Sequence, residues 1–174
     1  MRIRGKELDP LEPFTNRLAW EQHSITLLPF QPSDQAEARA LILSGLVEHW
    51  GFLDASKNPD LEDIASSYAE GFFLVARQEA WLVGTGALLP TAEPTTWQVV
   101  RMSVAKDLRR SGLGRQILSA LEQEARQRGV RRLILETTAA WQEVISFYLR
   151  CGYQILEAQG EVQTTEDVYF EKCL

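Results

Sequence analysis

The sequence predicts an α/β (α+β) fold in which helices flank a mixed, mostly antiparallel central sheet. Two observations carry this prediction: helical patterns and a hairpin come first, and a strand–helix–strand unit follows in the second half. With 174 residues, 45% of them hydrophobic and 24% charged, the chain is large enough to bury a core in one globular domain. We expect that domain over residues 23–174, preceded by an irregular N-terminal extension over residues 1–22 that contains two prolines.

The first half of the domain combines two predicted helices with a β-hairpin. Pro32, Ser33 and Asp34 are typical of a helix start, and apolar residues recur behind them at helical spacing. Two runs rich in aromatic and branched residues flank the segment 78–80, which is typical of an antiparallel hairpin. In order, we expect a strand over 24–28, a helix from Pro32 to about His49, a loop over 51–60, a helix from Pro59 or Asp60 with Leu61, Ile64, Ala65 and Tyr68 on one side, and strands over 72–77 and 81–89.

The second half of the domain is organised around a strongly amphipathic helix over 113–128, which Gly129 ends. One face of this helix carries Leu113, Ile117, Leu118, Leu121 and Ala125. Around it we expect strands over 95–104 and 131–136, a helix over 141–150 with Val144, Ile145, Tyr148 and Leu149 inward and Gly152 as its stop, and strands over 153–158 and 167–173.

The composition excludes several classes of protein. No apolar stretch approaches the roughly 20 residues of a membrane span, and the basic N-terminus lacks the apolar segment of a signal peptide. Cys151 and Cys173 are the only cysteines and lack metal-ligand spacing, which predicts a reduced, cytoplasmic protein without a structural metal. Cys151 has no base partner visible in the sequence, so we expect it to be structural rather than nucleophilic.

Charge is distributed unevenly along the chain. The net charge is −6, yet residues 101–132 hold nine Lys or Arg against three Asp or Glu. A basic stripe on an acidic protein favours a small polyanionic ligand over nucleic acid, which selects broadly basic domains. The alternative is that the last four arginines of the stripe, Arg126, Arg128, Arg131 and Arg132, form a solvated helix end.

Residues 99–114 combine a strand, a short charged loop and Arg-Arg-Ser-Gly-Leu-Gly at a helix start. The first amides of a helix lack partners and its dipole is positive at that end, so this junction predicts a phosphate site. Gly112 and Gly114 leave room for a backbone to approach a phosphate, and Ser111 is placed to cap the helix. A plain tight turn is the alternative. A dinucleotide fingerprint requires a small residue where Ile117 stands, and a nucleoside triphosphate loop requires Gly-Lys-Ser/Thr, so both are disfavoured.

Four segments resemble the GNAT superfamily of N-acetyltransferases. They are Arg-Met-Ser-Val at 101–104, Arg109-x-x-Gly112-x-Gly114, Leu-Glu-Thr at 135–137, and the aromatic–Tyr–three residues–Gly–aromatic segment at 147–153. The resemblance covers about residues 72–158. It implies the acyl-CoA N-acyltransferase fold, acetyl-CoA as co-substrate, no metal, and direct transfer of the acetyl group to an amine.

The resemblance also implies roles for individual residues. The Met102 amide lies near the thioester carbonyl, the Val104 backbone pairs with the pantetheine arm, and Tyr148 is the general acid that protonates the departing thiolate. Core packing with a satisfied hydroxyl is the alternative for Tyr148. The residues implied to contact the co-substrate are Met102, Ser103, Val104, Arg109, Arg110, Ser111, Gly112, Leu113, Gly114, Arg115, Thr137, Trp141, Phe147 and Tyr148. Trp141 stands where family motifs often have Asn. The hydrogen bond that an Asn side chain would make to the cofactor arm is therefore not expected here.

The general base is left open by the sequence. Gln98 stands where several family members carry a catalytic Glu, and a neutral amide cannot accept the proton. Four side chains and a chain of water molecules are alternatives, and each of the four also has an ordinary structural explanation. The four are Glu136, Glu93, Glu48 and His49.

The acceptor is expected beside the loop that follows the first helix. Trp50 and Phe52 are candidates to stack on it and Glu136 to contact it, with aromatic rings that merely cover the sheet as the alternative. The carboxylates expected to attract a cationic amine are Glu48, Asp54 and Asp60.

The resulting prediction is an acetyl-CoA-dependent N-acetyltransferase that acts on a primary amine of a small molecule or an amino-acid-like acceptor. Transfer to a protein or peptide amine and a non-catalytic acyl-CoA-binding regulatory module are the alternatives. We expect no nucleic-acid or membrane partner, and a homodimer is left open.

Overall fold

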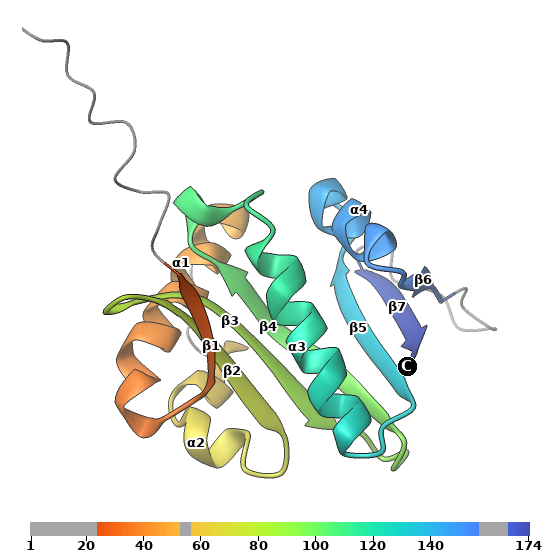
Figure 1. The fold of residues 1–174 in the computed structure, drawn as a ribbon. Helices are drawn as coiled ribbons and strands as arrows, with labels where there is room; N and C mark the ends of the chain where they lie inside the picture. The colour runs from red at the N-terminus through yellow and green to blue at the C-terminus, as the bar shows by residue number, and fades with distance from the viewer. Residues whose placement is uncertain (1–23, 53–56, 157–166) are drawn as a thin grey trace, which may run out of the picture.

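The computed structural model describes residues 24–52, 57–156 and 167–174. In these residues a seven-stranded sheet has the order β1-β2-β3-β4-β5-β7-β6 (Figure 1). Neighbouring strands are antiparallel except β4 and β5, which are parallel. The predicted mixed, mostly antiparallel sheet is therefore confirmed. The predicted extension over 1–22 lies outside the described residues.

The elements of the N-terminal half follow the predicted order. They are β1 (Ile25–Pro29), α1 (Gln35–Trp50), α2 (Ile64–Ser67), β2 (Phe72–Gln78) and β3 (Trp81–Pro90). The predicted helix after Pro59 is interrupted: a short 3-10 helix (Pro59–Leu61) comes first, and α2 is a single turn whose start Asp63 caps by accepting from the Ser66 N–H at 3.0 Å. Because the helix is broken there, Ala65 is exposed, contrary to prediction, while Ile64 is buried.

The elements of the C-terminal half are β4 (Thr96–Val104), α3 (Leu113–Gln127), β5 (Arg132–Thr138), α4 (Gln142–Arg150), β6 (Gln154–Ile155) and β7 (Asp167–Cys173). All five apolar residues predicted on the inner face of α3 are buried. In α4, Tyr148 is buried but Leu149 is 46% exposed, contrary to prediction, because this short helix turns only one narrow side to the core. Only residues 154–155 of the predicted strand over 153–158 form β6, and residues 157–158 lie outside the described part.

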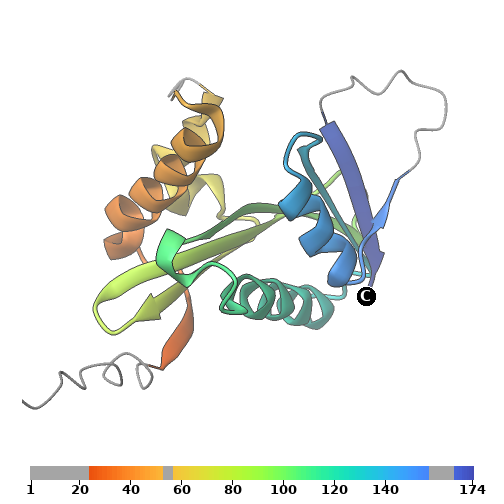
Figure 2. The same ribbon diagram turned by 90° about the horizontal axis from the view of Figure 1, so that it is seen from above.

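Helices cover both faces of the sheet (Figure 2). One core cluster joins α1 and α2 to Phe73, Val75 and Ala87, and the other joins α3 and α4 to β4, β5 and β7. Alternate residues of a strand point to opposite faces, so β2 contributes to both clusters. The central strands are therefore buried on two sides.

Two glycines allow α3 to lie close to β3. A Cβ atom on Gly84 would stand 2.7 Å from Ile117 Cδ1, and one on Gly86 would stand 2.7 Å from Ile117 Cγ2 and 2.8 Å from Met102 Sδ. These distances are shorter than van der Waals contact. The absence of side chains at both positions thus sets the distance between helix and sheet, and with it the position of the start of α3.

Candidate active site

β4 and β5 diverge after only three residue pairs. The pairs are Thr96↔Arg132, Trp97↔Leu133 and Gln98↔Ile134. Beyond them β4 continues along β3, and β5 continues along β7 (Figure 1). We call the region beyond Gln98 and Ile134 the fork. Within the fork, the edge of β4 that faces β5 has no neighbouring strand in the described part of the chain, so backbone groups along it can bind a ligand.

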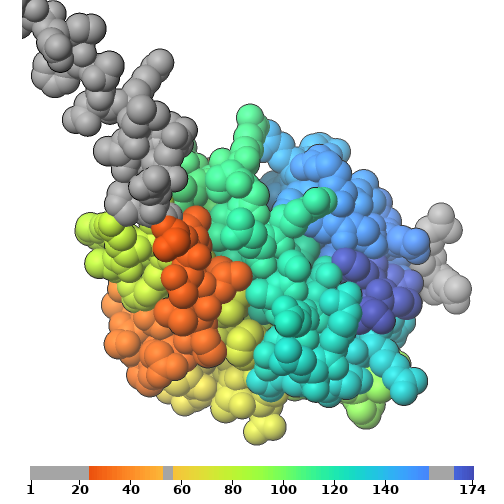
Figure 3. Space-filling model, viewed as in Figure 1, coloured from red at the N-terminus to blue at the C-terminus, as the bar shows by residue number. Residues whose placement is uncertain are grey.

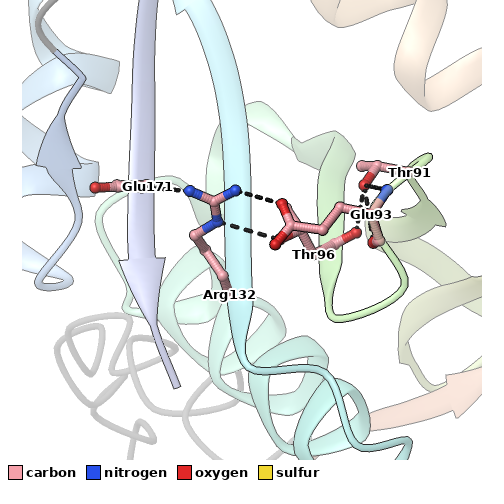
Figure 4. A network of polar contacts seen from close by, with 5 residues as sticks. All are labelled: Thr91, Glu93, Thr96, Arg132 and Glu171. Atoms are coloured by element: carbon pink, nitrogen blue, oxygen red, sulfur yellow. Dashed lines mark hydrogen bonds and ion pairs between the residues drawn. The ribbon is translucent and has the colours of Figure 1, made fainter.

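The paired end of the fork is held by an ionic network (Figure 4). Arg132 at the start of β5 contacts Glu93 Oε2 at 2.6 Å and Glu171 Oε2 at 3.3 Å, and its Nε donates to Thr96 Oγ1 at 3.1 Å. Hydrogen bonds from Thr96 and Arg132 lower the pKa of Glu93. Glu93 thus lies at the end opposite the fork and forms an ion pair. Neither feature fits the role of general base, for which Glu93 was a candidate.

A bulge interrupts β4 inside the fork. Thr85 pairs with Ser103 and Ala87 with Val100, so Gly86 alone faces two residues of β4, Arg101 and Met102. Arg101 has a φ of 56°, a left-handed conformation that is uncommon for a residue other than glycine. The Thr85 hydroxyl donates to the Arg101 carbonyl at 2.8 Å. Because all described peptide bonds are trans, the Met102 N–H at the other side of this peptide points away from Thr85.

The loop that leads from β4 into α3 has alternating backbone conformations. Arg110 has a φ of 65° and Gly112, the N-cap of α3, a φ of 93°. Gly112 directly precedes Leu113, the first residue of α3, and a left-handed residue next to a right-handed one turns successive N–H groups toward one side and forms a concave anion site. Nothing lies within 4 Å of a Cβ built on Gly112, so its φ, not crowding, requires glycine there. The Ser111 hydroxyl lies 3.4 Å from the Leu113 N–H and so assists the helix start.

Several amides of this loop have no partner. In the described part of the chain, the N–H groups of Arg110, Gly112, Gly114 and Arg115 donate to no oxygen of the protein. They lie at the N-terminus of a helix of 15 residues, where the helix dipole adds positive potential. The predicted phosphate site therefore has both the donors and the electrostatic potential for a pyrophosphate.

The three arginine side chains near this loop contact the protein itself. Arg109 pairs with Glu48 at 2.7 Å and donates to the Val104 carbonyl at 3.2 Å. Arg110 pairs with Glu143 at 2.8 Å, and both side chains are 84% exposed. Arg115 donates to the Arg150 carbonyl at the end of α4. The loop is thus tied to α1 and α4, and Figure 3 shows the loop, in green, beside α4, in blue.

The basic stripe predicted over 101–132 does not form one surface. The α3 helix, about 22 Å long at 1.5 Å per residue, separates the loop arginines from those at its C-terminal end. At that end Arg128 pairs with Glu124 and its guanidinium lies over the Phe72 and Trp97 rings. The arginines near the start of α3 are therefore the ones that lie beside the loop amides.

Tyr148 lies in a cluster of rings beneath α4. Its ring packs against Phe147, Tyr153 and Phe170 with centroid distances between 5.1 and 5.8 Å. Burial raises the pKa of Tyr148 above its ordinary value, with a smaller contribution from Cys151. Its hydroxyl makes no hydrogen bond to any residue that the structure describes. A Cβ atom built on Gly114 would stand 3.6 Å from the Phe147 ring, so this cluster of rings adjoins the start of α3.

Gln98 and Glu136 lie on the same face of the sheet at the fork. Gln98 pairs with Ile134, and Glu136 follows two residues later on β5, so its side chain points to the same side as that of Ile134. That side is the α1 face, because Leu133 and Leu135 point into the α3 core. Glu136 is exposed and forms no ion pair in the described residues. Thr137, the next residue, is buried on the α3 face.

Three aromatic rings join α1 to α4 across the open end of the fork. The rings of His49 and Trp141 are stacked with centroids 4.3 Å apart, and Trp50 lies 5.4 Å from Trp141. Trp50 is 49% exposed and Phe52 is 66% exposed. The departure from the family motif at Trp141 therefore gives a contact between the two sides of the fork rather than a polar group.

The carboxylates expected to attract a cation are engaged elsewhere. The hydrogen bond from Arg109 lowers the pKa of Glu48, and Asp60 accepts from Arg101 and from the Tyr68 hydroxyl. Asp54 lies outside the described residues. Among the acidic side chains expected near the acceptor and described by the structure, Glu136 forms no ion pair.

Sequence analysis missed the part that Arg101 and Thr85 play at the bulge. An arginine among the apolar residues of a strand was the available signal, but its partner Asp60 lies 41 residues away. Among the described residues no group of acidic, His or Cys side chains is arranged to hold a metal ion, and no helix could span a membrane.

Known proteins resemble this chain. Residues 36–153 match the model of the Acetyltransferase (GNAT) family. N-acetyltransferase 8F1 of Rattus norvegicus is 34% identical over 101 residues, which cover 55% of this chain and 46% of that protein. An IAA acetyltransferase of Azospirillum brasilense is 37% identical over 81 residues, 47% of this chain and 53% of that one. The chain spans about half the length of the curated relatives it matches.

Solved structures share the fold. An acetyltransferase of the GNAT family from Staphylococcus aureus Mu50 matches with a TM-score of 0.76 and 20% identity over 86% of this chain and 99% of that one. The PaiA N-acetyltransferase of Thermoplasma acidophilum, solved in complex with coenzyme A, matches with a TM-score of 0.70 and 15% identity over 87% of this chain and 99% of that one. With the family match extending over more than half of the sequence, the forked sheet and the loop at the start of α3 are those of a chain that belongs to the GNAT family of acetyltransferases.

Proposed function

We propose that this protein is an acetyl-CoA-dependent N-acetyltransferase that acts on the primary amine of a small molecule. The observation that carries the proposal is the fork, which leaves one edge of β4 open and ends near the start of α3, where four amides have no partner among the residues that the structure describes. An extended arm with an amide backbone fits the first feature and a pyrophosphate fits the second. Coenzyme A combines these two chemical groups in one molecule.

The residues of the fork fit acetyl-CoA as follows. The backbone from Met102 to Val104 would pair with the pantetheine arm, and the amides of Arg110 to Arg115 would hold the pyrophosphate. When bound, acetyl-CoA supplies an acetyl group already activated as a thioester. Met102 N–H is then available to donate a hydrogen bond to the thioester carbonyl oxygen as negative charge grows on it.

Two side chains are proposed to move protons. A phenol is protonated at neutral pH even at its ordinary pKa, and burial raises the pKa of Tyr148 further, so its hydroxyl carries a proton that a departing thiolate can accept. Glu136 is proposed to accept the proton of the attacking amine. Glu136 suits this role better than the other three candidates do. Glu48 and Glu93 are paired with arginines, and the His49 ring is stacked on Trp141.

The aromatic contact between α1 and α4 supports a small acceptor. His49 and Trp50 at the end of α1, which packs on β3 and β4, contact Trp141 at the start of α4, so the two sides of the fork are joined. A small acceptor fits beside such a contact better than a folded protein does. Transfer to a peptide amine is the second candidate.

The first experiment is a calorimetric titration with acetyl-CoA and CoA, with NADH and ATP as controls. Micromolar binding of the two CoA forms alone supports the proposal, and an amine panel that includes amino acids, polyamines and short peptides then identifies the acceptor by released thiol. Equal binding of ATP or NADH would contradict the coenzyme assignment. Binding of acetyl-CoA without transfer to any amine would favour a non-catalytic acyl-CoA-binding module.

The role of Tyr148 is tested by Tyr148→Phe. We expect kcat to fall at least tenfold, about 1.4 kcal/mol of barrier, while the Kd for CoA stays unchanged because the ring packing is retained. Tyr153→Phe, in the same ring cluster, is the matched control and should keep kcat. An unchanged kcat in Tyr148→Phe would remove this residue from the mechanism.

A further inference from the structure

Arg101 is the residue of the bulge whose conformation is least expected. It carries a full side chain at a φ of 56°, where glycine would be the ordinary choice. Such a conformation persists in a folded protein when surrounding contacts hold it. The contacts of the Arg101 side chain therefore indicate what maintains the bulge.

The guanidinium of Arg101 is held by groups of the segment before α2. Its Nε donates to Asp60 Oδ2 at 2.8 Å, its Nη2 donates to Asp60 Oδ1, and its Nη1 donates to Asn58 Oδ1 at 2.9 Å. Asp60 also accepts from the Tyr68 hydroxyl at 2.7 Å. The Arg101 and Asp60 side chains are only 20% and 26% exposed. A two-pronged contact of this kind fixes the orientation of a planar guanidinium as well as its place.

The charges of Arg101 and Asp60 balance each other in this contact. Burial by itself raises the pKa of Asp60, but the hydrogen bonds from Arg101 and Tyr68 and the charge of Arg101 outweigh it and leave the pKa below its ordinary value. Asp60 is therefore ionised at neutral pH. Arg101 then has a full negative charge as its partner, and neither group is left unpaired in a half-buried position.

The backbone of Arg101 is held from the opposite side. The Thr85 hydroxyl donates to its carbonyl, so the peptide between Arg101 and Met102 is fixed at the oxygen, while the side chain fixes the Cα end. Rotation of this peptide would move the Met102 N–H, which points away from Thr85. Two independent anchors thus determine the direction of one N–H group.

We infer that Arg101 is a positioning residue, whose contact with Asp60 and Asn58 holds the β4 bulge so that the Met102 N–H is aimed at the reacting carbonyl. This inference rests on the proposed function, because the carbonyl in question belongs to acetyl-CoA. Arg101 itself does not touch the substrate. It acts through the Arg101–Met102 peptide, which it holds in place. Its partner Asp60 lies 41 residues earlier in the chain.

The composition of the chain offers a direct probe of this amide. The sequence contains two methionines, Met1 and Met102. When the chain is expressed with Met1 as its first residue, the nitrogen of Met1 is a terminal amine, so selective [15N]methionine labelling yields one backbone amide signal, that of Met102. In the wild-type protein we expect acetyl-CoA to displace this signal more than CoA does, because only acetyl-CoA has the thioester carbonyl.

Arg101→Lys keeps the charge but removes the two-pronged contact. We expect a displaced or broadened Met102 signal in the free protein, loss of the difference between acetyl-CoA and CoA, and a fall in kcat of at least tenfold with the Kd for CoA within twofold. Tyr68→Phe, a milder change that leaves the arginine in place, should displace the signal less. Arg77→Lys is the matched control, because Arg77 is 21% exposed and also binds two acidic groups on the α1 face, Asp34 and Glu37. It should leave the Met102 signal and kcat unchanged.

Two results would overturn the inference. One is an Arg101→Lys protein with the wild-type Met102 signal and the full difference between acetyl-CoA and CoA. The other is an Arg77→Lys protein that changes both as strongly as Arg101→Lys does, which would show general loosening of the fold. Failure of the proposed function is a different observation: neither CoA form would then bind to the wild-type protein or move its Met102 signal.

Discussion

Replacing Gly112 by alanine tests whether the left-handed start of α3 shapes the phosphate-binding loop. Gly112 has a φ of 93°, and a Cβ atom added to it would meet nothing within 4 Å. The substitution therefore adds backbone strain without a steric clash. Holding an L-residue in the left-handed region costs about 1–2 kcal/mol. That cost must appear either in the stability of the fold or in the binding of the ligand.

Two limits follow from this magnitude. If the loop keeps its conformation, the free energy of unfolding falls by about 1–2 kcal/mol and the Kd for CoA is unchanged. If the loop relaxes, stability is retained and CoA must restore the left-handed turn, so its Kd rises by about 5- to 30-fold. The two effects should sum to the same total. Urea denaturation and calorimetric titration with CoA measure the two parts.

Gly129 provides the matched control at the other end of the same helix. Its φ is 79° and a Cβ there would also meet nothing within 4 Å. Gly129→Ala should lower stability by a similar amount and leave the Kd for CoA unchanged, because it lies far from the loop. An alanine at 112 with wild-type stability and wild-type Kd would refute the strain argument. Equal weakening of CoA binding by both substitutions would refute the placement of the phosphate site.

Two further predictions concern the fork. Glu136→Gln should lower kcat by a factor of about 100 or more, with the Kd for CoA unchanged, because it removes the proposed proton acceptor and keeps the shape of the side chain; steady-state kinetics and calorimetry measure both, and an unaltered kcat would return the role to water. Gly86→Ala should lower the free energy of unfolding by about 1–3 kcal/mol in urea, since its Cβ would stand 2.7 Å from Ile117 Cγ2. Gly114→Ala, whose Cβ would make only ordinary contact at 3.6 Å with Phe147, is its control and should be close to neutral.

Local patterns in the sequence determined where the elements lie. The apolar stripe of α3 and the alternation of the hairpin strands are set by the 3.6- and 2-residue periods of helix and strand, and both were located within a residue or two. The Gly-x-Gly spacing predicts Gly112 at the helix start, where a phosphate approaches the backbone. The structure adds that a φ of 93° requires glycine there. Where the pattern was short, as after Pro59 and at Leu149, the predicted inner face was wrong.

The charged residues of the site could not be sorted by sequence alone. Glu48, Glu93 and Glu136 were candidates for the general base, and Glu48 and Asp60 were expected to attract a cationic amine. An acidic residue in a sequence carries no sign of its partner, so the sequence could not separate them. The fold pairs Glu48 with Arg109, 61 residues away, and Asp60 with Arg101, 41 residues away, and leaves Glu136 unpaired beside the fork among the described residues.

The sequence by itself determined the order and type of the elements, the glycine-containing helix start and the family, because these depend on neighbours a few residues apart. Only the tertiary structure decided which arginines face the loop at the start of α3, which carboxylate is unpaired, and how the Arg101 peptide is oriented. Those features depend on ion pairs and burial between segments that meet only when the sheet and its helices pack together.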